Sequence, residues 1–269
     1  MPRPHDLPAG IGAVIAHHPP QPAPRLYGDL AWLWPLLSPP EHYLGEADIV
    51  RRVIDESLGP AAVGRRSILE LGAGGGHTLV HLADEFDTVA VDLSEPMLAG
   101  CRRLSPTTQT IVGDMRSLRV NRAFDAVLIH DAIDYMTTET DVRAALATAR
   151  AHLVPGGVAL IAPTYLRETF RDHELETDQH ITADIALSYV SYIYTRAPAT
   201  PATPATTFEL LLVYLIKQPA DAVHVRIEHD RHTCGLFGRD DWLNWLSDAG
   251  FNATHHEEEA WSLFTAVAR

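Results

Sequence analysis

The sequence predicts an α/β fold with a doubly wound parallel sheet, and three observations support this. Apolar runs and amphipathic segments alternate between residues 66 and 163, which is typical of βα units that follow one another. The apolar runs are continuous, so their strands should be buried on both faces. A glycine-rich turn, ELGAGGG, follows the first strand, as in sheets that bind a ligand at the carboxyl ends of their strands.

The individual elements follow from apolar spacing and from start and stop residues. Ser94 is a typical N-cap, and Gly59 and Gly250 are typical helix ends. We expect helices at 39–59, 77–86, 94–101, 139–153 and 240–249, core strands at 66–72, 87–93, 108–114, 124–130 and 158–163, and a closing hairpin over 251–269.

A different pattern occupies the stretch after Pro163. Residues 183–196, 206–217 and 222–237 are long, rich in β-branched and aromatic residues, and typical of strands. The Pro/Ala/Thr tract at 197–206 is interpreted as a mobile hairpin loop. We therefore expect a small antiparallel sheet inserted into the main fold, and the striped segment SYVSYIYT could pair two subunits in a homodimer.

Composition excludes several classes of function. The chain has 269 residues, 46% of them apolar, and a formal charge of −14 from 21 basic and 35 acidic residues. Such an acidic chain is not expected to bind nucleic acid, and no basic run suggests a membrane surface. The N-terminus lacks the apolar core of a signal peptide. Cys101 and Cys234 have no metal-type spacing and read as thiols, so we expect a cytoplasmic protein without a bound metal.

The glycine turn itself identifies a ligand. The dinucleotide pattern requires glycine at its sixth position, where this chain has His77, and no Lys-Ser/Thr follows as in a phosphate-binding loop. Glu70, just before the turn, would repel a pyrophosphate and attract an ammonium group. Asp92, at the end of the second strand, can accept from a ribose diol. A nucleoside with a cationic amino-acid part and no phosphate is S-adenosylmethionine.

Further cofactor contacts are expected beyond the turn. Asp114 can accept from the adenine amino group while the Met115 backbone pairs with the ring, although a strand-end cap is the alternative for Asp114. Leu93 and Met97 would pack on the adenine, although ordinary core packing is the alternative for Met97. The complete expected cofactor set is Glu70, Gly72, Gly74, Gly76, Asp92, Leu93, Met97, Gly113, Asp114, Met115 and His130.

These motifs, with VDLSEPML, VGDM and LVPGGVAL, resemble the class I S-adenosylmethionine-dependent methyltransferases. The resemblance implies a seven-stranded Rossmann-like sheet of order 3-2-1-4-5-7-6 with one antiparallel strand. EHYLGEADIV, GDMRSLRVNRAFDAV and HDRHTCGLF are similar to the amino-sugar N,N-dimethyltransferases of macrolide pathways. That likeness implies an inserted antiparallel β lid and places Tyr27 near the active site. The chain differs at IHDAIDYM, where those enzymes carry mostly small or apolar residues.

Candidate catalytic groups follow from the chemistry of methyl transfer. An amine acceptor needs only a route for its proton, whereas a phenol, enol or indole carbon benefits from a general base. We expect His130, His232 and Tyr27 to be catalytic candidates, with packing or loop roles as alternatives for the histidines. The expected substrate-binding residues are Tyr27, Trp32, Asp131, Tyr135 and His229.

The sequence is therefore interpreted as a methyltransferase of secondary metabolism in four regions. These are a flexible arm (1–24), a cofactor-binding core with an N-terminal helical segment (25–163), an inserted β lid (164–237) and a C-terminal helix and hairpin (238–269). The resemblance makes N-methylation of a small molecule the first choice of reaction. The alternatives are C- or O-methylation of an aromatic or indole-type product with a histidine base, and a non-catalytic cofactor-binding subunit or sensor.

Overall fold

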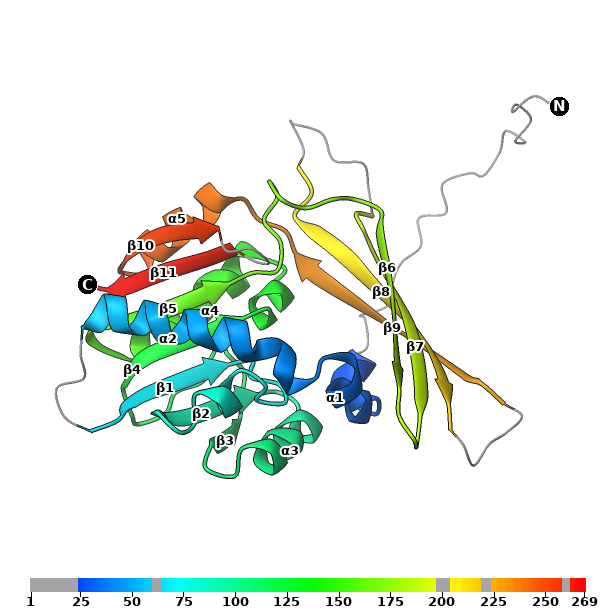
Figure 1. Ribbon diagram of the computed structural model, residues 1–269. Coiled ribbons are helices and arrows are strands. Elements are labelled where there is room, and N and C mark those ends of the chain that lie inside the picture. Colours follow the sequence, from blue (N-terminus) through cyan, green and yellow to red (C-terminus); the bar gives the residue numbers. More distant parts are fainter. Residues whose placement is uncertain (1–23, 60–63, 197–203, 219–223, 258–261) are drawn as a thin grey trace.

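Two β-sheets organise the molecule (Figure 1). A computed structural model describes residues 24–59, 64–196, 204–218, 224–257 and 262–269. The proposed N-terminal arm lies outside these residues, except for Pro24, as does most of the Pro/Ala/Thr tract. The seven-stranded sheet and its helices form one body, and a four-stranded sheet stands beside it (Figure 1).

The main sheet has the expected order, with one antiparallel strand. β11 runs antiparallel to both of its neighbours, β10 and β5, while the other neighbouring strands pair in parallel. From one edge to the other the strands are β3 (Gln109–Val112), β2 (Phe86–Asp92), β1 (Arg66–Leu71), β4 (Phe124–His130), β5 (Leu153–Ala162), β11 (Ser262–Ala268) and β10 (Phe251–Glu257).

Helices cover both faces of this sheet. α2 (Leu44–Leu58) and α3 (Glu95–Leu104) bury their apolar sides in one core, and α4 (Glu139–Ala151) and α5 (Arg239–Asp248) bury theirs in the other. The continuous apolar strands are explained by these two cores, because each strand has packing partners above and below. Ser94 caps α3 as expected, since its hydroxyl accepts from the Met97 N–H at 3.1 Å.

The helix expected at 77–86 is not formed. The segment between β1 and β2 consists of turns and a short 3₁₀ helix, η4 (Leu79–His81). Leu79 and Leu82 are nevertheless fully buried. The turns therefore bury the leucines whose apolar spacing suggested a helix.

The second sheet has four strands rather than the three expected. They pair in the order β6 (Glu174–Ile181), β7 (Ala186–Tyr194), β8 (Thr207–Lys217) and β9 (Arg226–Gly235). The missed strand, ELETDQHI, lies at an edge, pairs only with β7, and is mostly exposed. A polar edge strand has little of the apolar signal by which strands are recognised.

The N-terminal segment joins the two sheets. It contains η1 (Arg25–Tyr27), η2 (Ala31–Leu33), α1 (Trp34–Leu37) and η3 (Pro40–Tyr43). Its buried leucines pack against the second sheet in one apolar cluster whose fully buried members are Leu26, Leu30, Leu33, Ile185, Leu187, Leu212, Tyr214 and Ile216. Figure 1 shows α1 between the main body and the second sheet.

Two further expectations concern thiols and membranes. Cys101 and Cys234 are both buried and unbridged, as the sequence suggested. Within the described part of the chain, none of the helices has the length and apolarity to cross a bilayer.

Candidate active site

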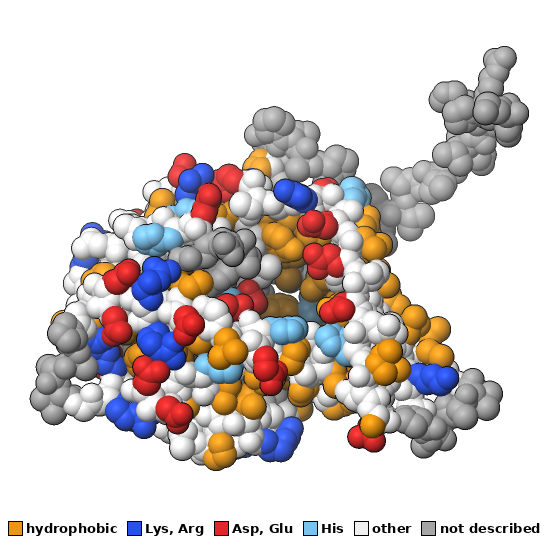
Figure 2. Space-filling view, in the orientation of Figure 1, with side chains coloured by type: hydrophobic (Ala, Val, Ile, Leu, Met, Phe, Trp, Pro, Cys, Tyr) orange, Lys and Arg blue, Asp and Glu red, His pale blue; other side chains and the backbone are white. Residues whose placement is uncertain are grey.

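A cavity of about 770 Å³ lies between the carboxyl ends of the parallel strands and the second sheet. Figure 2 shows the molecule hollowed between these two parts. The floor is the glycine turn with the ends of β2 and β4, and the N-terminal segment contributes another wall. The facing wall is the inner face of the second sheet, which we define by Glu176, Ser191, Leu212 and His232. Parallel α/β sheets bind ligands at this end of their strands.

The glycine turn is shaped by positive φ angles. Gly72, Gly74 and Gly76 have φ values of 80°, 51° and 74°. A Cβ on Gly72 would lie 2.2 Å from the Cβ of Ala132, and one on Gly76 would lie 2.4 Å from the Sγ of Cys101. Both positions therefore require glycine for packing and for backbone conformation. Of the three, Gly72 and Gly74 line the cavity, and Gly76 does not.

Glu70 is the most unusual charge in the site. Its side chain is only 4% exposed, and its Oε2 atom has no hydrogen-bond partner within the described residues. Burial, together with the nearby Glu46, Asp92 and Asp131, raises the pKa of Glu70 to about 8. A buried carboxyl without a partner costs free energy, so its presence at a cavity wall indicates a cationic ligand.

This pKa predicts a pH dependence for the ligand-free protein. Burial disfavours the ionised form of Glu70, so the folded state loses stability as the pH rises from the usual pKa of 4.5 towards about 8. We expect the free energy of unfolding to fall by up to about 1.4 kcal/mol per pH unit in this window. Thermal melts from pH 5 to 8 measure the slope, which Glu70→Gln should reduce. An identical slope in the variant would contradict this assignment.

The other acids expected to hold the nucleoside also line the cavity. Asp92 accepts from the Gly74 N–H at 2.8 Å and from the Ser94 N–H at 2.7 Å, so it is held in place by the turn. Asp114 is bonded by the guanidinium of Arg116, at 2.7 Å for the shortest contact. Leu93, Met97, Gly113 and Met115 are at the cavity wall as well.

His130 ends β4 on the cofactor side of the cavity. Its Nδ1 lies 3.7 Å from a carboxylate oxygen of Glu46, and its Nε2 lies 3.6 Å from Asp131. Burial raises the pKa of Glu46, which His130 opposes.

A hydrogen-bonded chain leads from the cavity into the second sheet. The Tyr27 and Tyr135 hydroxyls lie 2.8 Å apart, and the Tyr135 hydroxyl lies 2.7 Å from Nδ1 of His232. Nε2 of His232 is 2.9 Å from Asp230, which also accepts from the Leu26 N–H at 2.7 Å. These hydrogen bonds therefore join three parts of the fold: the N-terminal segment, the loop after β4, and β9.

The ionisation of this chain follows from its surroundings. Burial raises the pKa of Asp230, but the hydrogen bonds from His232 and from the Leu26 backbone outweigh it and leave that pKa lowered. Burial raises the pKa of both Tyr27 and Tyr135. At neutral pH this hydrogen-bonded chain of side chains thus has a carboxylate at its inner end and two protonated hydroxyls towards the cavity.

Two expected substrate residues are not at the cavity. Trp32 is 42% exposed, and His229 is exposed on the opposite face of β9 from His232. Neither of them lines the cavity. The reason for His229 is the two-residue period of a strand, because residues three apart point to opposite faces. The other expected substrate residues, Tyr27, Asp131 and Tyr135, do line it.

Sequence reasoning missed two residues of the site, Asp230 and Glu46. Asp230 has the strand spacing that places it beside His232, so the signal was present in HDRH. Glu46 lies within ion-pair distance of His130. The indole Nε1 of Trp34 is buried without a hydrogen-bond partner among the described residues, and Trp34 lines the cavity. No sequence signal identifies Glu46, because tertiary packing brings it there.

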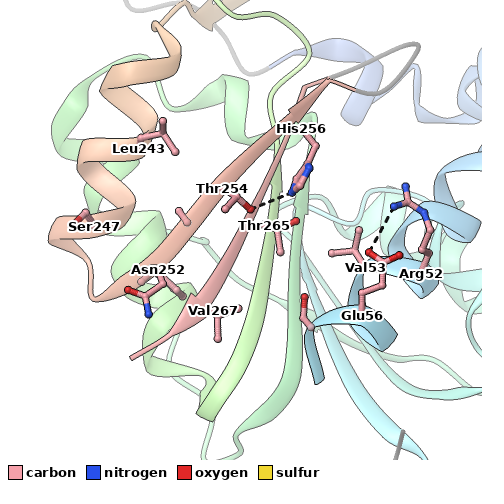
Figure 3. A pocket seen from close by; sticks show the side chains of 13 residues that line it. Arg52, Val53, Glu56, Leu243, Ser247, Asn252, Thr254, His256, Thr265 and Val267 are labelled. Atoms are coloured by element: carbon pink, nitrogen blue, oxygen red, sulfur yellow. Dashed lines mark hydrogen bonds and ion pairs between the residues drawn. The ribbon is translucent and has the colours of Figure 1, made fainter. Parts of the chain in front are cut away.

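A second cavity, of about 670 Å³, lies elsewhere, between α2 and the C-terminal hairpin (Figure 3). Its polar contacts are local: Thr254 with His256 at 3.0 Å, and Arg52 with Glu56 at 3.8 Å. Neither the glycine turn nor the tyrosine–histidine chain contributes to its walls. We therefore assign the chemistry to the first cavity.

Comparison with known proteins agrees with this fold. Residues 68–157 match the family model of a methyltransferase domain. A dTDP-3-amino-3,4,6-trideoxy-alpha-D-glucopyranose N,N-dimethyltransferase of Streptomyces venezuelae is 36% identical over 49% of this chain and 53% of its own length. A dTDP-3-amino-3,6-dideoxy-alpha-D-glucopyranose N,N-dimethyltransferase of Streptomyces fradiae is 29% identical over 69% and 70%. The first match thus spans only about half of that relative.

Solved structures match over nearly the whole chain. The crystal structure of Streptomyces venezuelae DesVI has a TM-score of 0.76 and 26% identity, covering 90% of this chain and 96% of that one. The sugar N-methyltransferase KedS8 from Streptoalloteichus also has a TM-score of 0.76, with 25% identity and coverage of 98% and 100%. The second sheet is therefore part of a shared architecture.

Proposed function

We propose that this chain, which belongs to the class I S-adenosylmethionine-dependent methyltransferases, methylates the amino group of an amino sugar in secondary metabolism. The observation that carries the proposal is the pairing of two features in one cavity. An unpartnered buried carboxylate, Glu70, suits a cationic cofactor, and a hydrogen-bonded chain ending at Asp230 suits an acceptor that loses a proton. The amino-sugar enzymes among the relatives support this choice of acceptor.

The residues present fit the cofactor. Glu70 would accept from its ammonium group, and the unpartnered indole N–H of Trp34 can donate to its carboxylate. Asp92 retains lone pairs for a ribose diol, and Asp114 lies at the cavity wall for the adenine. When bound, the cofactor supplies a methyl group on a positively charged sulfur, which is already an activated leaving group.

The protein's own task is to position the amine and remove its proton. When His232 is neutral, Asp230 accepts its Nε2 hydrogen, so Nδ1 accepts from the Tyr135 hydroxyl. The Tyr135 oxygen then accepts from Tyr27, whose own oxygen can accept from an amine N–H. A proton from the amine can pass over both hydroxyls to Nδ1, leaving an imidazolium beside the Asp230 carboxylate.

The proposal is tested by product analysis. Purified protein, S-adenosylmethionine and a panel of amino sugars should give S-adenosylhomocysteine and N-methylated products, identified by mass spectrometry and NMR. A methyl group found on oxygen or carbon of an aromatic acceptor would favour the second candidate. That candidate is supported by His232, because a phenol or indole carbon needs such a base. Cofactor binding without transfer to any acceptor would favour a sensor.

The proton route predicts the behaviour of His232→Gln. This variant keeps hydrogen-bonding groups but cannot take up a proton, so kcat at neutral pH should fall about tenfold to a hundredfold. Part of the loss should be recovered at higher pH, where the acceptor amine is already neutral. His229→Gln, on the opposite face of the same strand, is the control. A His232→Gln pH profile equal to that of the wild type would refute the route.

We also propose that two copies associate through the outer face of the second sheet. We define this face by its exposed apolar residues Leu175, Ile181, Leu215 and Ile227, which are 41% to 68% exposed. Hydrophobic side chains are visible over this sheet in Figure 2. Exposed apolar patches of this kind commonly mark protein interfaces.

Light scattering tests this association. The wild type should have the mass of a dimer, and Leu215→Glu should be monomeric. Val112→Glu, which changes an exposed apolar residue at the edge of the main sheet, should remain dimeric. A monomeric wild type would rule the association out.

A further inference from the structure

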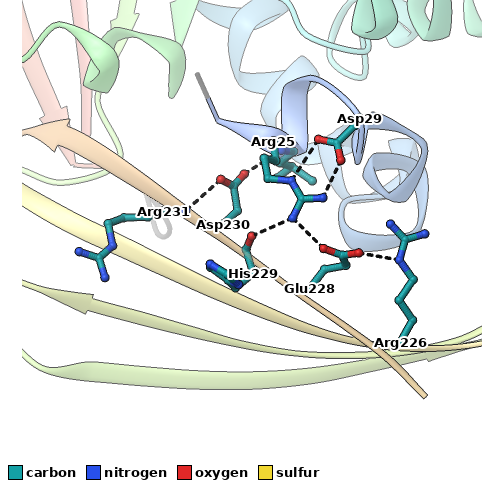
Figure 4. Close-up of polar contacts among 8 residues, drawn as sticks. Arg25, Asp29, Arg226, Glu228, His229, Asp230 and Arg231 are labelled. Carbon is teal, nitrogen blue, oxygen red and sulfur yellow. Dashed lines mark hydrogen bonds and ion pairs between the residues drawn. The ribbon is translucent and has the colours of Figure 1, made fainter. Parts of the chain in front are cut away.

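Among the described residues, two arginines line the cavity, Arg25 and Arg116, and both are paired with carboxylates. Arg25 bonds Asp29 at 2.6 Å and Glu228 at 2.7 Å (Figure 4). Arg116 bonds Asp114 at 2.7 Å and Asp141 at 3.1 Å. Each guanidinium therefore already has two carboxylate partners, with which an entering phosphate would compete. Phosphate recognition normally uses guanidinium groups whose N–H donors are free to bond the phosphate oxygens.

The cavity histidines are also buried or held beside acids. His77 is buried, and burial lowers its pKa. His232 has both ring nitrogens engaged, by Tyr135 and by Asp230. His130 lies between the carboxylates of Glu46 and Asp131. The cationic groups of this wall are thus each held beside an acid or buried in a neutral form.

The acceptor side of the cavity carries acids instead. Asp131, directly after β4, is 54% exposed on its side chain, and Glu176 lies on the inner face of the second sheet. Both line the cavity, as do Tyr27 and Tyr135. In Figure 2, acidic side chains border the hollow on both sides. Such a surface attracts an ammonium group and repels a diphosphate.

We infer that the acceptor is an amino sugar that carries no phosphate, such as a sugar already joined to an uncharged aglycone. This inference rests on the proposed function and narrows its substrate class. It sets the order of reactions: a glycosyl transfer must come first, in which an aglycone oxygen displaces the nucleoside diphosphate from the anomeric carbon. The curated relatives, by contrast, are described as acting on dTDP-linked sugars.

The first test is a titration with thymidine diphosphate in the presence of S-adenosylhomocysteine. The Streptomyces venezuelae relative serves as the positive control. We expect no saturable binding to this protein up to about millimolar concentration. Saturable binding well below this concentration would overturn the inference, whatever the outcome for the proposed function.

The second test compares acceptors. An alkyl glycoside of a 3-amino-3,6-dideoxyhexose should have a kcat/KM about a hundredfold above that of the same sugar linked to thymidine diphosphate, since like charges oppose the latter. The reverse preference would also overturn the inference. If neither amine is methylated although the cofactor binds, the proposed function fails. The titration with thymidine diphosphate then still shows whether the cavity excludes a diphosphate.

Variants of the two acidic residues test whether their charges cause the discrimination against the nucleotide-linked sugar. Removing both acidic charges with Asp131→Asn and Glu176→Gln should reduce the discrimination against the nucleotide-linked sugar at least about tenfold. Asp178→Asn is the matched control, because it lies on the same strand and face as Glu176 but outside the cavity. Unchanged discrimination in the double variant would show that these charges do not set the preference.

Discussion

Replacing Glu70 by glutamine is expected to weaken the binding of S-adenosylmethionine about a hundredfold. The carboxylate is 4% exposed and has an oxygen without a partner among the described residues, so a bound ammonium group would be its counter-charge. Removing one partner of a buried charge pair costs about 2–5 kcal/mol in binding. Calorimetric titration of both proteins with S-adenosylmethionine and S-adenosylhomocysteine measures the difference, and both ligands should lose affinity because both carry the ammonium.

The same substitution should have the opposite effect on stability. In the ligand-free protein the Glu70 carboxyl gains nothing from its burial, so Glu70→Gln should raise the free energy of unfolding by about 1 kcal/mol near pH 8. A gain in stability with a loss of affinity is the pattern of a residue that serves a ligand. A destabilised variant with normal affinity would instead indicate a structural role.

Glu209 offers a matched control. It is another fully buried glutamate, and one of its oxygens has no partner in the described part of the chain, but it lies on β8 away from the cavity and bonds Arg196 at 2.7 Å. Glu209→Gln should therefore lower stability and leave cofactor affinity unchanged. If Glu209→Gln weakened the cofactor as much as Glu70→Gln, the effect would reflect general loosening of the fold.

The parallel core was predictable because its signals are local. Continuous apolar runs, the glycine turn and the strand-end acids each follow from neighbouring residues, and they fixed the order of the strands through the family resemblance. The helix expected at 77–86 failed because apolar spacing alone cannot distinguish a helix from two tight turns that bury the same leucines. The edge strand β6 failed because its residues are mostly polar and exposed.

The acceptor side was harder to predict than the cofactor side. Both His229 and His232 were candidates, yet a strand places only one of them on the inner face. Applying this period to HDRH would have paired His232 with Asp230 and removed His229. Tyr27 and Tyr135, which continue this hydrogen-bonded chain, lie 205 and 97 positions from His232 in the sequence. Only the folded structure therefore brings these side chains together.

Gly72→Ala is expected to be the most destabilising single change in the glycine turn. The residue has a φ of 80°, and an added Cβ would lie 2.2 Å from the Cβ of Ala132, inside any real contact distance. Backbone strain costs about 1–2 kcal/mol and overpacking about 1–3 kcal/mol. We therefore expect a loss of about 2–5 kcal/mol in unfolding free energy, measured by chemical denaturation.

Gly156→Ala separates these two contributions. Gly156 has nearly the same φ, 75°, but nothing lies within 4 Å of an added Cβ. It should therefore lose only the strain part, about 1–2 kcal/mol, and keep normal cofactor affinity. The difference between the variants then measures the contact between the turn and Ala132, which belongs to the loop that carries Asp131 and Tyr135. Equal losses in both variants would mean that this loop moves aside freely, and the acceptor wall would not be held rigidly against the cofactor turn.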